Sequence, residues 1–144
     1  MMTWIEEMTY RIVLADDQPL IRQYVRLLLA DRPHLEIVAE ADDGVSLLQL
    51  LAEGSAKPAL IIVDISMPRL EGIEAVRWIH ALYPDIKLLM LTMHKDPYYL
   101  AKSLAAGASG YLVKEDAGAE LLAAIEAIFE GRTYVSSCLS AGAM

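Results

Sequence analysis

The chain has 144 residues, of which 56% are hydrophobic and 22% charged, a composition that excludes a disordered protein. Its formal net charge of −8 argues against nucleic-acid binding by this chain alone, because proteins that bind nucleic acid normally present a basic patch to the phosphates. The single cysteine, Cys138, excludes an intramolecular disulfide and suits a reducing cytoplasm. No apolar run approaches the roughly 20 residues of a membrane helix. We therefore expect one cytoplasmic domain without membrane contact.

Short apolar runs alternate along the chain with segments of helical periodicity. Most of the runs are unbroken, which suits strands buried on both faces of a parallel sheet, whereas the second mixes polar and apolar residues as an edge strand does. The predicted strands are, in chain order, 12–15, 35–40, 60–63, 88–91 and 110–113. The predicted helices lie at about 20–30, 45–54, 73–83, 96–107 and 117–130.

Residues that favour helix ends mark several of these boundaries. Gly54 and Gly107 suit the C-termini of the second and fourth helices. Asp96 followed by Pro97 predicts a helix start, with the aspartate as N-cap and the proline in the first turn. Pro84 ends the third helix.

Five strand–helix pairs predict a flavodoxin-like (βα)5 fold. Parallel strands require crossover connections, and the crossovers here are helical. The expected arrangement is a doubly wound parallel sheet with strand order 2-1-3-4-5. We expect the domain to span residues 10–135, after an N-terminal extension at 1–9, and we interpret 136–144 as the start of a linker.

Five polar residues directly follow predicted strands. Asp16 and Asp17 come after the first strand, Asp64 after the third, Thr92 after the fourth and Lys114 after the fifth. Each alone has an ordinary explanation, as a helix cap, a turn residue or a solvated charge. Together they are better explained by a shared site, because ligands of open α/β sheets bind at the carboxyl ends of the strands.

The chemistry of this set points to phosphoryl transfer assisted by a divalent cation. Crowded carboxylates repel one another unless a cation shares them, and hard oxygen ligands select Mg²⁺ (or Mn²⁺) over zinc. Asp64 is then an anionic nucleophile that needs no general base. Lys114 and the metal would neutralise the phosphoryl oxygens, and the Thr92 hydroxyl would donate a hydrogen bond to one of them.

The sequence resembles the receiver domain of two-component response regulators over roughly residues 10–135. The motifs that carry the resemblance are 14–19 (LADDQP), 63–68 (VDISMP), 91–92 (LT) and 110–114 (GYLVK). Segments 107–112 and 131–136 are similar to the NarL/LuxR-type branch. Members of that branch continue into a helix-turn-helix DNA-binding domain, so the resemblance implies that residues 136–144 lead to such a domain.

The resemblance implies a role for each site residue. Asp64 is the phosphoacceptor, supplied by the phosphohistidine of a sensor histidine kinase, and Lys114 contacts the phosphoryl group. Asp17 binds Mg²⁺ directly, Asp16 binds it largely through water, and the Ser66 backbone carbonyl is a further metal ligand. Thr92 and Tyr111 form the switch pair. The Tyr111 ring moves inward as the Thr92 hydroxyl shifts toward the phosphate.

The resemblance also implies partners and an output. The domain would act as a signalling module that catalyses only its own phosphorylation and dephosphorylation, form a homodimer on phosphorylation, and reach DNA only through the C-terminal domain. Two positions depart from the common pattern. Glu115 follows Lys114 where many receivers have proline, so a trans peptide bond is expected, and Met93 is larger than the residue usual after the threonine.

Three alternative functions fit parts of this pattern. An aspartyl phosphatase would need a second acid two residues after the nucleophile, and Ser66 occupies that position. A flavodoxin-like FMN carrier would need a phosphate-binding loop after the first strand, where Asp16 and Asp17 would repel a phosphate. A stand-alone receiver or phosphorelay intermediate stays within the family and differs only in the natural chain beyond Met144.

Overall fold

The computed structural model describes residues 9–142, and the side chains of 9–139. The expected extension at 1–9 therefore falls, apart from Thr9, outside the described residues. Six parallel strands form one sheet in the order β2-β1-β3-β4-β5-β6. The strands are β1 (Tyr10–Ala15), β2 (Leu35–Ala41), β3 (Leu60–Val63), β4 (Lys87–Thr92), β5 (Gly110–Val113) and β6 (Tyr134–Val135).

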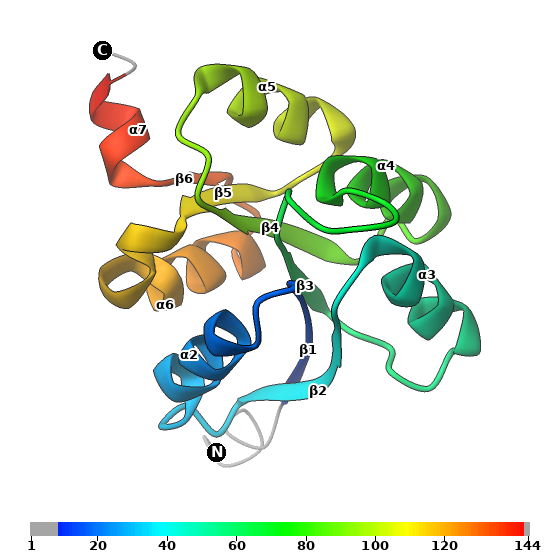
Figure 1. Cartoon of the computed structure of the whole chain (residues 1–144). Coiled ribbons are helices and arrows are strands. Elements are labelled where there is room, and N and C mark those ends of the chain that lie inside the picture. The colour runs from blue at the N-terminus through cyan, green and yellow to red at the C-terminus, as the bar shows by residue number, and fades with distance from the viewer. Residues whose placement is uncertain (1–8, 143–144) are drawn as a thin grey trace.

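Helices cover both faces of the sheet (Figure 1). On one face α2 and α6 contribute buried side chains such as Val25 and Leu121, and on the other α3, α4 and α5 contribute residues such as Leu47 and Ile79. The helices are α2 (Pro19–Leu29), α3 (Gly44–Glu53), α4 (Gly72–Leu82), α5 (Pro97–Ala106), α6 (Ala117–Phe129) and α7 (Ser137–Gly142), with a 3₁₀ turn η1 (Lys114–Asp116). This is the doubly wound arrangement predicted from the sequence.

The helix ends have the local causes expected from the sequence. Gly54 and Gly107 end α3 and α5 with φ of 82° and 118°, in the left-handed region. The Asp96 side chain accepts a hydrogen bond from the Tyr98 N–H, and Pro97 occupies the first position of α5. No helix among residues 9–142 combines the length and apolar character needed to span a membrane.

The C-terminal part of the domain adds two elements to the five predicted pairs. Tyr134 and Val135 pair with Gly110 and Tyr111 and form β6 at the edge of the sheet. A two-residue strand is too short to give a periodic pattern, so the sequence did not predict it. Residues 137–142, within the segment interpreted as a linker, form α7.

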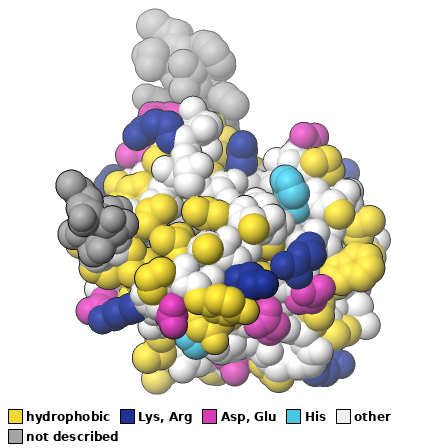
Figure 2. Space-filling view, turned by 90° about the horizontal axis from the view of Figure 1, so that it is seen from above, with side chains coloured by type: hydrophobic (Ala, Val, Ile, Leu, Met, Phe, Trp, Pro, Cys, Tyr) yellow, Lys and Arg dark blue, Asp and Glu magenta, His cyan; other side chains and the backbone are white. Residues whose placement is uncertain are grey.

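The surface over α5 is mixed in character. Figure 2 views the molecule from this side and shows hydrophobic, basic and acidic side chains interspersed. Tyr98 on α5 is more than half exposed. The face thus presents apolar contact area between charges.

Candidate functional site

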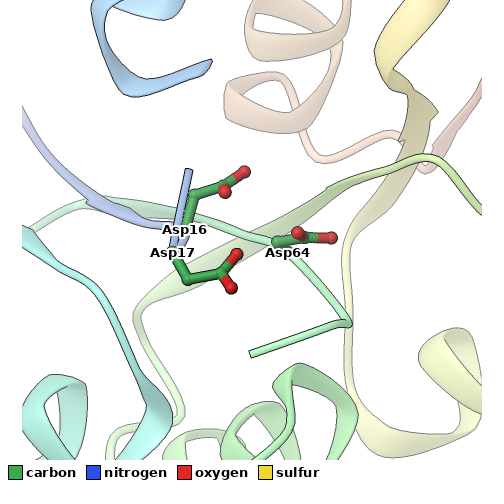
Figure 3. A group of neighbouring side chains, drawn as sticks. All are labelled: Asp16, Asp17 and Asp64. Carbon is green, nitrogen blue, oxygen red and sulfur yellow. The ribbon is translucent and has the colours of Figure 1, made fainter. Parts of the chain in front are cut away.

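Three aspartates meet at the carboxyl end of the sheet. One carboxylate oxygen from each of the three residues lies within 4.8 Å of the other two. Figure 3 shows Asp16, Asp17 and Asp64 side by side. Backbone hydrogen bonds set their positions, because Asp64 N–H donates to the Ala15 carbonyl at 2.9 Å and Asp16 N–H donates to the Ala41 carbonyl at 3.0 Å. Asp16 and Asp64 are buried, whereas Asp17 is exposed.

The first turn of α4 fixes the backbone at Asp64. Gly72 N–H donates to the Ile65 carbonyl at 2.8 Å. A Cβ at Gly72 would lie 1.9 Å from the Asp64 carbonyl oxygen, so only glycine permits this close approach. Ile65 and Met67, on either side of Ser66, are buried in the core beneath the loop.

Lys114 supplies the positive charge of the site. Its Nζ lies 3.1 Å from Asp64 Oδ2 and 3.0 Å from Asp16 Oδ2, and it also donates to Gln18 Oε1 at 2.8 Å. Burial raises the pKa of Asp16, and the nearby charge of Asp64 acts in the same direction. Hydrogen bonds from Gln18 N–H and from Lys114 oppose the rise without cancelling it.

Thr92 and Tyr111 are both fully buried on neighbouring strands. The Thr92 Oγ1 accepts a hydrogen bond from the His94 N–H at 3.3 Å, and the Tyr111 hydroxyl donates to the His94 carbonyl at 2.7 Å. Burial raises the pKa of Tyr111. The Tyr111 ring is therefore already inside the protein in this structure. The resemblance implies that the ring takes this inward position when Thr92 has shifted toward the phosphate.

A pocket of about 170 Å³ lies at this end of the sheet. Ser66 and His94 share a hydrogen bond at its rim, with 2.8 Å between Ser66 Oγ and His94 Nε2. The pocket is lined by Asp17, Gln18, Asp64, Ser66, Thr92, Met93, His94 and Lys114. The residues predicted to form the site therefore lie together here. Asp16 and Tyr111 do not line the pocket themselves, but Asp16 forms an ion pair with Lys114 and the Tyr111 hydroxyl donates to the His94 carbonyl.

The sequence did not single out Gln18 or His94 as site residues. Gln18 directly follows the acidic pair, and His94 lies two residues after Thr92, which were the available signals. Their contacts with Lys114 and Ser66 join residues far apart in the chain, so local patterns give no access to them. The peptide bond between Lys114 and Glu115 is trans, as predicted.

Comparison with known proteins decides the family. The model of the response regulator receiver domain matches residues 12–126, most of the chain. The chain belongs to this family. The receiver domain is also similar to transcriptional regulatory protein DegU of Brevibacillus brevis, with 37% identity over 131 residues that cover 91% of this chain and 55% of DegU.

Solved structures agree with this assignment. A LuxR-family two-component response regulator from Aurantimonas sp. SI85-9A1 has 39% identity and a TM-score of 0.84 over 92% of this receiver domain and 93% of that chain. The isolated REC domain of RcsB from Salmonella enterica serovar Typhimurium, in the presence of the phosphomimetic BeF3−, has 25% identity and a TM-score of 0.84, covering 92% and 96%. DegU and the LuxR-family protein place this receiver in the NarL/LuxR branch, and the chain spans little more than half the length of DegU.

Proposed function

We propose that this receiver domain accepts a phosphoryl group on Asp64 from the phosphohistidine of a sensor histidine kinase. The observation that carries the proposal is the buried Asp64 carboxylate, which borders a pocket and lies 3.1 Å from the Lys114 ammonium. A carboxylate oxygen of Asp64 attacks phosphorus, and the new P–O bond forms as the P–N bond to the kinase histidine breaks. The electron pair of that bond leaves with the imidazole.

Residues around Asp64 stabilise the transferred group. Lys114 offsets the negative charge that phosphoryl oxygens bring into the site. The Thr92 hydroxyl turns away from the His94 N–H, from which it accepts a hydrogen bond, and donates to one phosphoryl oxygen. Because Thr92 is fully buried, that hydrogen bond forms where water does not compete strongly.

The acidic cluster fits Mg²⁺, or Mn²⁺ as the alternative. Its donors are hard carboxylate oxygens, and the exposed Asp17 leaves one side open for the waters that Mg²⁺ retains. We propose that Asp17, Asp64 and the Ser66 backbone carbonyl hold the ion directly, and Asp16 largely through water. When bound, the ion supplies neutralisation of charge on the phosphoryl oxygens.

Phosphorylation on Asp64 is tested with a small donor. In acetyl phosphate and Mg²⁺ the parent should gain one acid-stable, hydroxylamine-labile phosphoryl group by mass spectrometry, and Asp64→Asn should gain none. Asn keeps the side-chain shape, so the comparison isolates the nucleophile. An equal gain in the Asn variant would reject Asp64 as the acceptor.

We further propose that Thr92 and Tyr111 pass the change to the face formed by α5, β5 and α6. Since the Tyr111 ring is already buried, the change begins with the Thr92 hydroxyl leaving the His94 N–H for the phosphoryl group. Thr92→Ala should still accept phosphate but lose most of the beryllofluoride-induced amide shifts across residues 96–130. A full shift pattern in Thr92→Ala would mean that the signal leaves the site by another route.

The output is inferred from the relatives. DegU is by name a transcriptional regulatory protein, and this chain corresponds to about half of it. We propose that the receiver controls transcription through a C-terminal DNA-binding domain, with a homodimer formed on phosphorylation. Gel filtration of the parent with and without beryllofluoride tests the dimer, and an unchanged elution volume would argue against it.

A further inference from the structure

The turn that presents Lys114 is bound by a buried serine from the C-terminal end of the domain. Ser136 is fully buried. Its Oγ accepts a hydrogen bond from Val113 N–H at 3.1 Å and donates to Asp116 Oδ2 at 2.5 Å. Its own N–H donates to the Tyr111 carbonyl at 2.8 Å. One side chain thus joins the residue before Lys114 to the end of the turn that Lys114 begins.

We propose that Ser136 is a positioning residue for Lys114, and that it ties the C-terminal segment 134–142 to the phosphoacceptor pocket. The inference rests on the proposed role of Asp64 and deepens it, because it names a contact through which the state of the pocket reaches the end of the domain. Ser136 does not touch the phosphoryl group. It acts through the turn.

The turn needs such a brace because its sequence gives it little rigidity. Glu115, the middle residue of the turn, is not a proline, so no ring fixes its φ. The side chain of Glu115 pairs with Lys95, but both side chains are more than half exposed, and exposed ion pairs contribute little to stability. The buried hydrogen bonds of Ser136 therefore hold the turn in the shape that aims Lys114 at Asp64.

The same contacts connect the turn to the C-terminal segment. Ser137 N–H and the Tyr134 hydroxyl both donate to the Glu120 carboxylate, at 3.0 and 2.7 Å, so segment 134–137 is fixed to α6 as well as to the turn. A phosphoryl group that draws Lys114 toward it must shift the Ser136 contacts. Coupling of this kind is reciprocal, so loosening the Ser136 contacts must in turn weaken binding at the pocket.

Ser136→Ala tests the brace from both directions. It removes the hydroxyl and leaves every contact of Lys114 with Asp16 and Asp64 chemically possible. We expect the affinity for beryllofluoride in excess Mg²⁺, measured by NMR titration, to fall about fivefold or more, the lower end of typical couplings between sites. In the parent, beryllofluoride should change the rate of amide hydrogen exchange in residues 137–142 by a similar factor. In Ser136→Ala, beryllofluoride should leave that rate unchanged.

The neighbouring serine provides a matched control. Ser137 bonds to Glu120 and not to the Lys114 turn, so Ser137→Ala should speed exchange in α7 while beryllofluoride affinity stays at the parental value. Asp116→Ala breaks the brace at a less buried residue but keeps the bond between Val113 N–H and Ser136, so combining it with Ser136→Ala should lower the affinity no further than Ser136→Ala alone.

Three outcomes would overturn the inference. These are parental beryllofluoride affinity in Ser136→Ala, equal losses in Ser136→Ala and Ser137→Ala, or losses that multiply in the double variant. Failure of the proposed function looks different. In that case the parent itself would bind no beryllofluoride, whatever residue stands at 136.

Discussion

Replacing Gly72 by alanine tests how closely the first turn of α4 must pack against the end of β3. Gly72 begins α4, where alanine is the better helix former, so the substitution carries no conformational penalty of its own. The new Cβ would lie 1.9 Å from the Asp64 carbonyl oxygen and 2.7 Å from its carbonyl carbon, and the first distance is about 1.5 Å inside van der Waals contact. Both are backbone atoms that cannot rotate away, so α4 or the end of β3 has to move.

The expected cost follows from that displacement. Overpacking a buried site costs about 1–3 kcal/mol, and a backbone contact belongs at the upper end, which corresponds to a fall of about 10 °C in Tm for a domain of this size. The same shift displaces Asp64, and a misplacement of about 1 Å at a reacting group can reduce a rate about a hundredfold. Differential scanning calorimetry and phosphoryl uptake from acetyl phosphate measure the two effects.

Gly118→Ala is the control for the loss of glycine itself. Its Cβ would meet the Tyr24 hydroxyl at 2.7 Å, the far end of a partly exposed side chain that can rotate. We expect Tm to stay level or rise, because alanine restricts the unfolded chain more than glycine does. If Gly72→Ala melted within about 2 °C of the parent and took up phosphate at the parental rate, the packing argument at Asp64 would be refuted.

Three further changes probe the switch, the metal and the acid stability of the fold. Tyr111→Phe leaves the His94 carbonyl without the hydroxyl that donates to it at 2.7 Å, so urea denaturation should show a loss of about 1–3 kcal/mol, and an unchanged midpoint would contradict this. Asp17→Ala should weaken Mg²⁺ binding in calorimetric titration while the metal-free protein keeps or gains Tm, because one of three crowded like charges is removed; parental Mg²⁺ affinity would reject the metal site. The hydrogen bond from the Ser46 N–H lowers the pKa of the Asp43 carboxyl. The ionised Asp43 therefore stabilises the fold fully above about pH 4, and this stabilisation is lost as the pH falls through the lowered pKa. Tm plotted against pH should therefore fall less steeply for Asp43→Ala than for the parent below about pH 4, and parallel curves would show that Asp43 is not the group responsible.

The sequence predicted the residues of the site better than their contacts. Asp16, Asp64 and Thr92 could be predicted to lie together because each directly follows an apolar run, and parallel strands bring such positions to one edge. Gln18 and Ser136 were missed because their importance lies in hydrogen bonds to Lys114 and its turn, and those partners are brought close only by the tertiary fold.

The same distinction holds for the fold. The five strand–helix pairs follow from periodicity and from helix-end residues such as Gly54 and Pro97. The sheet gains β6 only because Tyr134 and Val135 meet the edge of β5. No local pattern in two residues encodes that pairing. The hydrogen bond from the Tyr111 hydroxyl to the His94 carbonyl likewise joins β5 to the loop after β4, a contact that only the tertiary fold creates.

The charge balance of the site supports the proposal that a divalent cation and a phosphoryl group act together here. Three carboxylates and one ammonium leave two negative charges without a partner, and a divalent cation supplies the two that are missing. Phosphorylation then replaces the single charge of Asp64 by about −1.5 to −2, so the balance tips negative again. The Lys114 ammonium, 3.1 Å from Asp64 Oδ2, is the positive charge at hand, and Ser136 holds the turn that carries it. On the proposed function, added charge at Asp64 pulls through Lys114 on the backbone at the end of β5, which is where we propose that the change leaves the site.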